Sequence, residues 1–93
     1  MKAIVLLKIT SGEVRAAYRC LKRLERVSEC CMTFGRYDAA AIINADTLEE
    51  IRNIIISDIQ PIPGVTETLT SLVVEDEFLE NPERQKDFLK TNG

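Results

Sequence analysis

The stretch KAIVLLKIT, residues 2–10, is apolar on both faces of an alternating pattern, and the rest of the fold must form around it. One face carries Ala3, Val5, Leu7 and Ile9, and the other carries Ile4 and Leu6. Alternation of this kind is typical of a β-strand, and a strand with two apolar faces belongs in the middle of a sheet. The stretch therefore predicts a central strand that is ended by Ser11-Gly12.

The elements that follow can be read from changes in the period of the apolar residues. Residues 13–25 place Val14, Ala17, Leu21 and Leu24 at helical spacing. Residues 28–34 alternate as a second strand, and Gly35-Arg36 predicts a turn. Residues 37–45 are apolar, short and bounded by turn residues, which predicts a third strand although alanine is a weak strand former.

The second half of the chain predicts a helix, a strand and a terminal helix. Thr47 and Glu50 have the spacing of a capping box, and the predicted helix continues to Ile59 and stops before Pro61. Residues 65–75 alternate as a last strand. Asn81-Pro82-Glu83 has the pattern of a helix start, and it predicts a short helix that ends near residue 89.

This order predicts an α+β, ferredoxin-like βαββαβ fold: a four-stranded antiparallel sheet, two helices on one face, and a short C-terminal helix. We expect one domain over residues 1–76 and an acidic tail over 77–93.

Two helices cover only one face of such a sheet, yet apolar residues point to both. The last strand is expected to place Val65, Leu69 and Val73 on one face and Leu72 and Val74 on the other. Soluble monomers rarely leave several hundred Å² of apolar surface in water. We therefore expect the open face to pack against a second copy, with a twofold dimer as the default. The alternative is cover by the tail helix, through Phe78, Leu79, Phe88 and Leu89.

Composition narrows the class of protein. The chain has 93 residues, of which 45% are apolar and 29% charged, and no apolar run approaches the roughly 20 residues of a membrane span. With no signal-peptide pattern and no disulfide framework among three cysteines, a cytoplasmic location is expected. The net charge is −3, so the chain is a poor candidate for holding a nucleic-acid backbone. The one basic cluster, which falls on the first predicted helix, is expected to be a solvated helix face; it contains Arg15, Arg19, Lys22, Arg23 and Arg26.

The residues needed for common catalytic sites are missing. The sequence has no histidine, which excludes a His-based triad, a His general base and a His metal ligand. Cys30 and Cys31 are neighbours on a predicted strand, so they point to opposite faces and do not form a metal or redox pair. No phosphate-binding glycine loop is present. We expect a protein that is not an enzyme and that has no cofactor and no metal.

Two segments carry more polar chemistry than local structure requires. In residues 33–38, Gly35 permits a positive-φ turn and Asp38 is placed to bond the turn's amides. In residues 62–70, Thr66, Thr68 and Thr70 are expected to share one face of the last strand, either as ordinary strand formers or as a row of ligand-binding hydroxyls.

In their order, these segments resemble the effector-binding (RAM) domain of the Lrp/AsnC transcription regulators. The resemblance covers residues 2 to about 76, and rests on Thr33-x-Gly35-x-Tyr37-Asp38, the helix after Asp46, and Ile62-Pro63-Gly64-Val65-x-x-Thr68-x-Thr70. It implies a domain that dimerises through its sheet, assembles further, often into four dimers, and binds amino acids or similar small effectors between dimers. By position, it implies a ligand site formed by Gly35, Tyr37, Asp38, Thr68 and Thr70, and we add Thr66 as a neighbouring candidate. Asp38 would accept the ammonium, amides near Gly35 or the threonine hydroxyls would bind the carboxylate, and Tyr37 would wall the pocket.

The full regulators carry a helix-turn-helix domain before this one, and here the chain starts at the first strand. The resemblance then implies a stand-alone sensor, with no direct contact to nucleic acid or membrane, that modulates transcription by co-assembly with full-length regulators. The alternatives are a dimeric α+β-barrel enzyme of the monooxygenase type, the related ACT domain, and an oligomerisation module without ligand. An enzyme of that type usually needs His, Trp or Asn in its cavity, and here Asn44 is the only strand asparagine.

Overall fold

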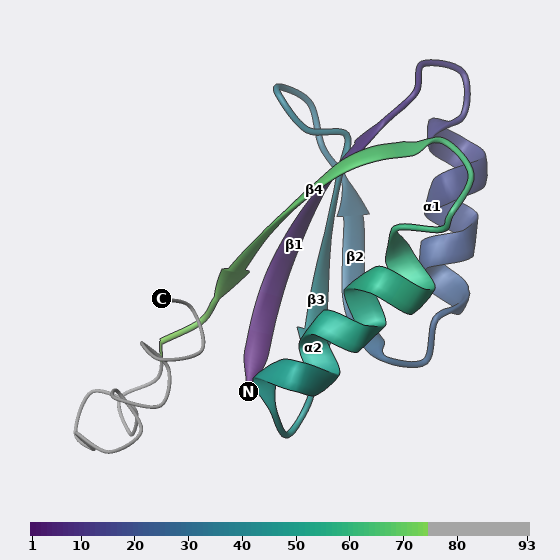
Figure 1. The fold of residues 1–93 in the computed structure, drawn as a ribbon. Helices are drawn as coiled ribbons and strands as arrows, with labels where there is room; N and C mark the ends of the chain where they lie inside the picture. The colour runs from purple at the N-terminus through teal and green to yellow at the C-terminus, as the bar shows by residue number, and fades with distance from the viewer. Residues whose placement is uncertain (75–93) are drawn as a thin grey trace.

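Four strands form one antiparallel sheet in the order β2-β3-β1-β4, with two helices on one of its faces, as Figure 1 shows. The computed structural model describes residues 1–74. The elements are β1 (Lys2–Ile9), α1 (Val14–Arg23), β2 (Val27–Met32), β3 (Ala39–Asn44), α2 (Leu48–Ile54), the π-helix η1 (Ile55–Ile59) and β4 (Val65–Leu72). The predicted ferredoxin-like order is confirmed. The predicted tail helix lies outside the described residues, so the tail and the boundary at residue 76 stay predictions.

β1 is the central strand that its two apolar faces predict. It pairs with β3 from Lys2 to Leu7 and with β4 from Ala3 to Ile9. Residues that are paired across strands share a face, so each row across the sheet lies either under the helices or on the open side. The rows under the helices pass through Ala3, Val5 and Leu7, which are at most 1% exposed. Leu21 of α1 and Ile51 of α2 are buried in the same core.

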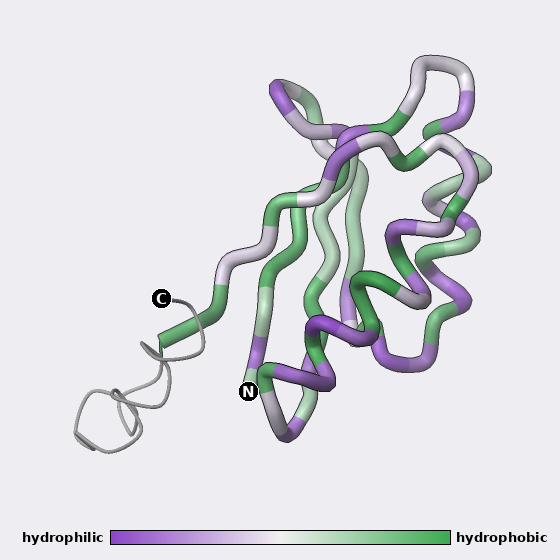
Figure 2. Tube along the Cα trace, in the orientation of Figure 1, coloured by the Kyte–Doolittle hydropathy of each residue, from purple (hydrophilic) through white to green (hydrophobic). Residues whose placement is uncertain are grey.

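The opposite face of the sheet is apolar and uncovered within residues 1–74. Leu6 pairs with Ala40 on one side and with Leu69 on the other, while Ile4 pairs with Ile42. Ile4 is 39% exposed and Leu69 is 49% exposed. Figure 2 shows hydrophobic residues along all four strands, although the helices lie on one side only. We call the surface formed by Ile4, Leu6, Ala40, Ile42 and Leu69 the open face.

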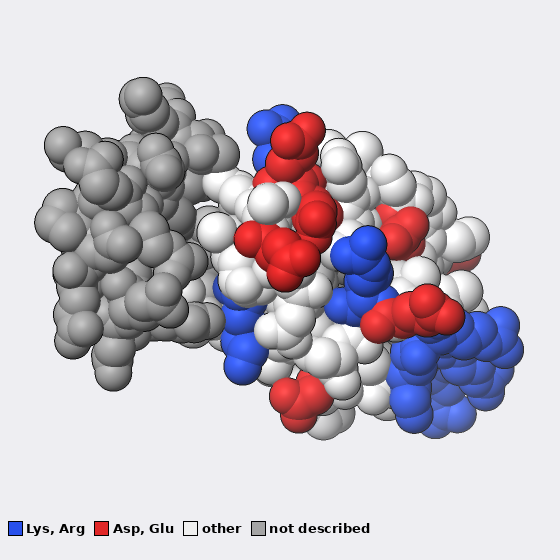
Figure 3. Space-filling view, turned by 90° about the horizontal axis from the view of Figure 1, so that it is seen from below, with Lys and Arg blue, Asp and Glu red and all other residues white. Residues whose placement is uncertain are grey.

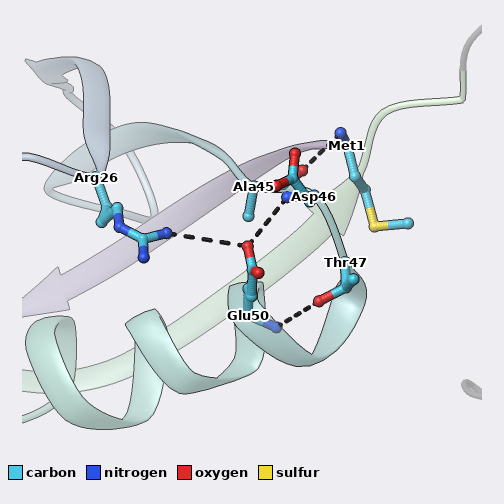
Figure 4. A network of polar contacts seen from close by, with 6 residues as sticks. All are labelled: Met1, Arg26, Ala45, Asp46, Thr47 and Glu50. Atoms are coloured by element: carbon cyan, nitrogen blue, oxygen red, sulfur yellow. Dashed lines mark hydrogen bonds and ion pairs between the residues drawn. The ribbon is translucent and has the colours of Figure 1, made fainter.

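The start of α2 is held by a polar network that Figure 4 shows. Thr47 caps the helix, accepting a hydrogen bond from the Glu50 amide at 3.1 Å. The Glu50 carboxylate accepts from the amide of Asp46 at 3.1 Å, one residue before the cap, and lies 4.0 Å from the Arg26 guanidinium. The N-terminal ammonium of Met1 donates to the Ala45 carbonyl at 2.7 Å. The Thr47 half of the predicted capping box is confirmed, whereas the Glu50 carboxylate bonds the amide of Asp46 and not that of Thr47. The network also ties together the N-terminus, the end of β3 and the start of α2.

The last turn of the second helical segment is a π-helix. The Gln60 amide donates to the Ile55 carbonyl at 2.8 Å, a hydrogen bond that spans five residues in place of four. Ile51, Ile55 and Ile59 are spaced four apart, which drifts around an α-helix of 3.6 residues per turn. The wider turn brings all three isoleucines into the core, where none is more than 8% exposed.

Two strand predictions were wrong in detail. β2 ends at Met32, before the predicted Phe34, whose side chain is fully exposed in the loop to β3. Val65 was expected on the same face as Leu69, but the register of β4 shifts between Lys8 and Ile9. The shift places Val65 against the core, whereas Leu69 lies on the open face. An alternating pattern cannot reveal such a bulge, because one extra residue reverses every side chain that precedes it.

Candidate functional site

The loop between β2 and β3 is a compact hairpin held by its own polar groups. The Thr33 amide donates to the Asp38 carbonyl at 3.0 Å, and the Thr33 hydroxyl donates to the Tyr37 carbonyl at 2.7 Å. Gly35 has a φ of 125°, in a region that only glycine adopts readily, and a Cβ there would meet nothing within 4 Å. Glycine is therefore required at position 35 by the backbone conformation and not by a close neighbour.

Asp38 fastens this hairpin to the central strand. Its amide donates to the Leu7 carbonyl at 2.8 Å, and its carboxylate oxygen Oδ2 accepts from the Ile9 amide at 2.7 Å. The second bond extends the ladder between β1 and the hairpin beyond the last paired residue, with a side chain in place of a backbone carbonyl. The carboxylate is only half-buried, so its other oxygen can accept a second donor.

The segment that leads into β4 lies on the other side of the same part of β1. The Thr10 amide donates to the Gly64 carbonyl at 2.8 Å, and the Thr66 hydroxyl donates to the Lys8 carbonyl at 3.2 Å. The Lys8 carbonyl and the Ile9 amide belong to one peptide group. That group therefore bonds Thr66 on one side and Asp38 on the other, and joins the two candidate segments at the same end of the sheet.

The three threonines do not form one row of hydroxyls. Thr66 lies at the register shift and has no paired residue on β1. Thr68 and Thr70 pair with Leu7 and Val5, so they lie on the helix side of the sheet. The Thr68 hydroxyl accepts from the Gln60 side chain at 3.2 Å, and Thr70 borders a groove beside α2 and η1. The structure brings Gly35, Tyr37, Asp38 and Thr66 to one end of the sheet and separates Thr70 from them.

The exposed parts of the hairpin form a rim. Tyr37 is half-buried, whereas Phe34, Gly35 and Arg36 are exposed. The role of the Lys8–Ile9 peptide group was missed in the sequence, because only the three-dimensional register brings Asp38 and Thr66 to it.

Within residues 1–74 no group of three or more His, Cys, Asp or Glu residues is placed to hold a metal ion. Burial raises the pKa of Tyr18 above 10.0, and interaction with Cys30 raises it further. The Tyr18 hydroxyl donates to the Cys30 carbonyl at 3.2 Å and joins α1 to β2, so it acts as a structural donor. Cys30 packs against the core.

Positive charge gathers on α1. Figure 3 shows a dense group of Lys and Arg side chains on one part of the surface. The basic residues of α1 and of the loop after it are all exposed: Arg15, Arg19, Lys22, Arg23 and Arg26. Lys22 lies 5.6 Å from the centre of the Tyr18 ring. The group faces solvent, as predicted from its spacing. None of the helices within residues 1–74 is long and apolar enough to cross a membrane.

Comparison with known proteins gives a consistent family. A family model described as the Lrp/AsnC ligand binding domain matches residues 2–82. The solved structure of FFRP-DM1 is 25% identical with a TM-score of 0.74, and the match covers 78% of this chain and 97% of that one. TTHA0845 from Thermus thermophilus is 27% identical with a TM-score of 0.75, covering 80% and 92%. No curated protein sequence matches the chain.

A longer relative shares the fold. The transcriptional regulator NMB0573 from Neisseria meningitidis, solved as a complex with L-Met, is 14% identical with a TM-score of 0.72. The match covers 81% of this chain and 50% of that one, so the chain spans about half the length of that regulator. At this identity the likeness shows the fold alone.

Proposed function

The chain belongs to the Lrp/AsnC ligand-binding domain family, and on this premise we propose that it binds an amino acid at the hairpin end of its sheet. Membership makes it a regulatory effector-binding domain. The finer proposal concerns the effector and its site: Gly35, Tyr37, Asp38 and Thr66 form one wall of a ligand cleft, with Thr68 next to them on β4. Support for an amino acid comes from the complex of a structural neighbour with L-Met.

The Lys8–Ile9 peptide group is the observation that carries the proposal. It fixes Asp38 and Thr66 relative to each other, because it donates to one at 2.7 Å and accepts from the other at 3.2 Å. A site that must recognise an ammonium and a carboxylate together needs an acceptor and donors at fixed positions. Asp38 offers the acceptor and the loop amides near Gly35 offer the donors, while the Thr66 hydroxyl, which donates its proton to Lys8, can only accept from a ligand.

Assembly completes the cleft in this proposal. The open face is the surface through which two copies pack, and contact between dimers supplies the wall opposite Tyr37. Co-assembly with longer members of the family would carry the effector signal to DNA, since we assign no DNA-reading surface to residues 1–74. We propose no catalytic role and a cytoplasmic location, in line with a transcription regulator.

A thermal-shift screen of the purified chain against all twenty amino acids tests the proposal. A ligand at about 100 times its Kd should stabilise the fold by roughly 2.7 kcal/mol. Asp38→Asn is the informative variant, because an amide oxygen can still accept from the Ile9 amide while the negative charge is lost. We expect this variant to keep its fold and to lose the shift. If no amino acid shifts the wild type at millimolar concentration, the chain is an oligomerisation module and the proposal fails.

A further inference from the structure

A groove on the helix side of the sheet is separate from the hairpin end. It has a volume of about 360 Å³ and lies between α2, η1 and the edge strand β4. Its walls are five aliphatic side chains, one hydroxyl and one guanidinium: Leu48, Ile51, Ile55, Ile56, Leu72, Thr70 and Arg52. We propose that this groove binds a small aliphatic carboxylate that lacks an amino group, a 2-oxo acid with a branched aliphatic chain being the best fit.

The π-helix shapes the apolar part of the groove. Ile55 and Ile56 are the first two residues of η1, and both line the groove. Ile55 is 8% exposed and packs into the core, whereas Ile56 is 54% exposed at the rim. Turns of π-helix occur often at functional sites, where they place side chains that a regular helix would carry elsewhere. The consequence here is an aliphatic wall that remains open to small molecules.

The charges around the groove select the ligand. Arg52 is exposed and forms no ion pair with any residue among 1–74, where the one pair present joins Arg26 and Glu50. The Thr70 hydroxyl likewise has no hydrogen-bond partner within the described residues. No Asp or Glu from this part of the chain lines the groove, although Glu49 lines a neighbouring hollow with Arg52. A carboxylate therefore finds a cation and a hydroxyl donor, whereas an ammonium would meet the Arg52 charge and find no carboxylate among residues 1–74 to balance its own.

The size of the groove agrees with a small ligand. Ligand pockets in proteins typically start at about 300 Å³, so this groove is near the lower end of the range. The inference goes beyond the proposed function, because the hairpin site offers a carboxylate to an amino group and the groove does not. The two sites would let one chain distinguish an amino acid from the corresponding oxo acid.

Titration calorimetry with 4-methyl-2-oxopentanoate on the whole chain tests this second site. Loss of a charged hydrogen bond typically lowers affinity at least about tenfold, so Arg52→Gln should weaken binding by that factor or more. Thr70→Val should weaken it less, since it removes a neutral donor. Arg19→Gln on α1 also removes one exposed arginine, away from the groove, and should leave binding unchanged. In the Asp38→Asn background the oxo acid should still bind and leucine should not, which separates this site from the hairpin site.

Any one of the following results would overturn the proposal. The first is no heat of binding at about 10 mM oxo acid, a concentration that would populate even a weak site. The second is equal affinity in the wild type and in Arg52→Gln, or loss of oxo-acid binding in Asp38→Asn. The third is a lower sedimentation coefficient for Ile56→Glu, which would assign the groove to contact with a second copy.

Discussion

The two faces of the sheet differ in how far their apolar residues are buried, although the same strands supply both faces. On the helix side, Val5, Leu7 and Ile43 are at most 1% exposed. On the open face, Ile4 and Leu69 are 39% and 49% exposed. Ile42 and Ile43 are consecutive residues on β3 and point to opposite faces. The comparison shows that the apolar residues on one side of the sheet are buried within residues 1–74. Those on the other side need an additional partner surface to become buried.

The largest expected effect comes from Ile43→Ala, which removes a fully buried side chain. We expect a loss of about 2–5 kcal/mol in the free energy of unfolding, measured by urea denaturation. Ile42→Ala is the matched control, because it makes the same change one residue away on the open face. Its loss should be smaller in dilute protein and should grow with protein concentration. An equal loss for both variants at every concentration would contradict the distinction between the faces.

Leu69→Lys should break the open face without unfolding the subunit. A leucine buried on each of two copies contributes on the order of 3 kcal/mol to a dimer, which corresponds to about a hundredfold change in affinity. Sedimentation equilibrium measures the dissociation constant, and circular dichroism checks the fold. Ile56→Lys is a suitable control, because Ile56 is exposed to a similar degree, 54%, but lies on the helix side. Unchanged self-association of Leu69→Lys would argue against the open face as the interface.

Asp38→Ala should cost about 1–3 kcal/mol of stability, because it leaves the Ile9 amide without its partner. Asp38→Asn should cost much less. Chemical denaturation of both variants separates the structural role of the side chain from its charge. If both variants were as stable as the wild type, the hydrogen bond to Ile9 would make no measurable contribution to the free energy of unfolding.

The smallest effect concerns the cap of α2 on the helix side. Thr47→Ala removes the acceptor of the Glu50 amide, and a loss of about 1 kcal/mol is typical of such a cap. Thr47→Ser keeps the hydroxyl and should restore most of the stability, as followed by the midpoint of thermal unfolding. A similar midpoint for the alanine and serine variants would show that the cap hydrogen bond does not stabilise the N-terminus of α2.

The sequence was a reliable guide wherever one period continued without interruption. The two faces of residues 2–10 predicted the central strand, and Thr47 with Glu50 predicted the start of α2. It failed where a single residue changes the period. The bulge near Thr66 moved Val65 to the core side, and the π-turn after Ile54 was not predicted, although Ile51, Ile55 and Ile59 are spaced four apart.

The candidate site was predictable in part for the same reason. Gly35 was identified because a hairpin needs a positive φ. Asp38 was expected to bond the amides of its own turn, and this was wrong, because its carboxylate accepts from the Ile9 amide on β1. The connection of Asp38 and Thr66 through one peptide group depends on long-range register. Arg52 gave no signal, because a single arginine on a helix is ordinary until Thr70 and Leu72 are placed opposite it.

The Lys8–Ile9 peptide group gives the hairpin end a thermodynamic consequence. An effector that draws on the Asp38 carboxylate competes with the Ile9 amide for the same charge, so its affinity includes the free energy of adjusting that bond. β1 also carries Ile4 and Leu6 on the open face. A neighbouring subunit that packs there and stiffens β1 therefore changes the free energy of adjusting the bond between Asp38 and Ile9. Linkage requires this coupling to be equal in both directions. Effector binding would then change the affinity between subunits by the same factor by which subunit association changes the affinity for the effector.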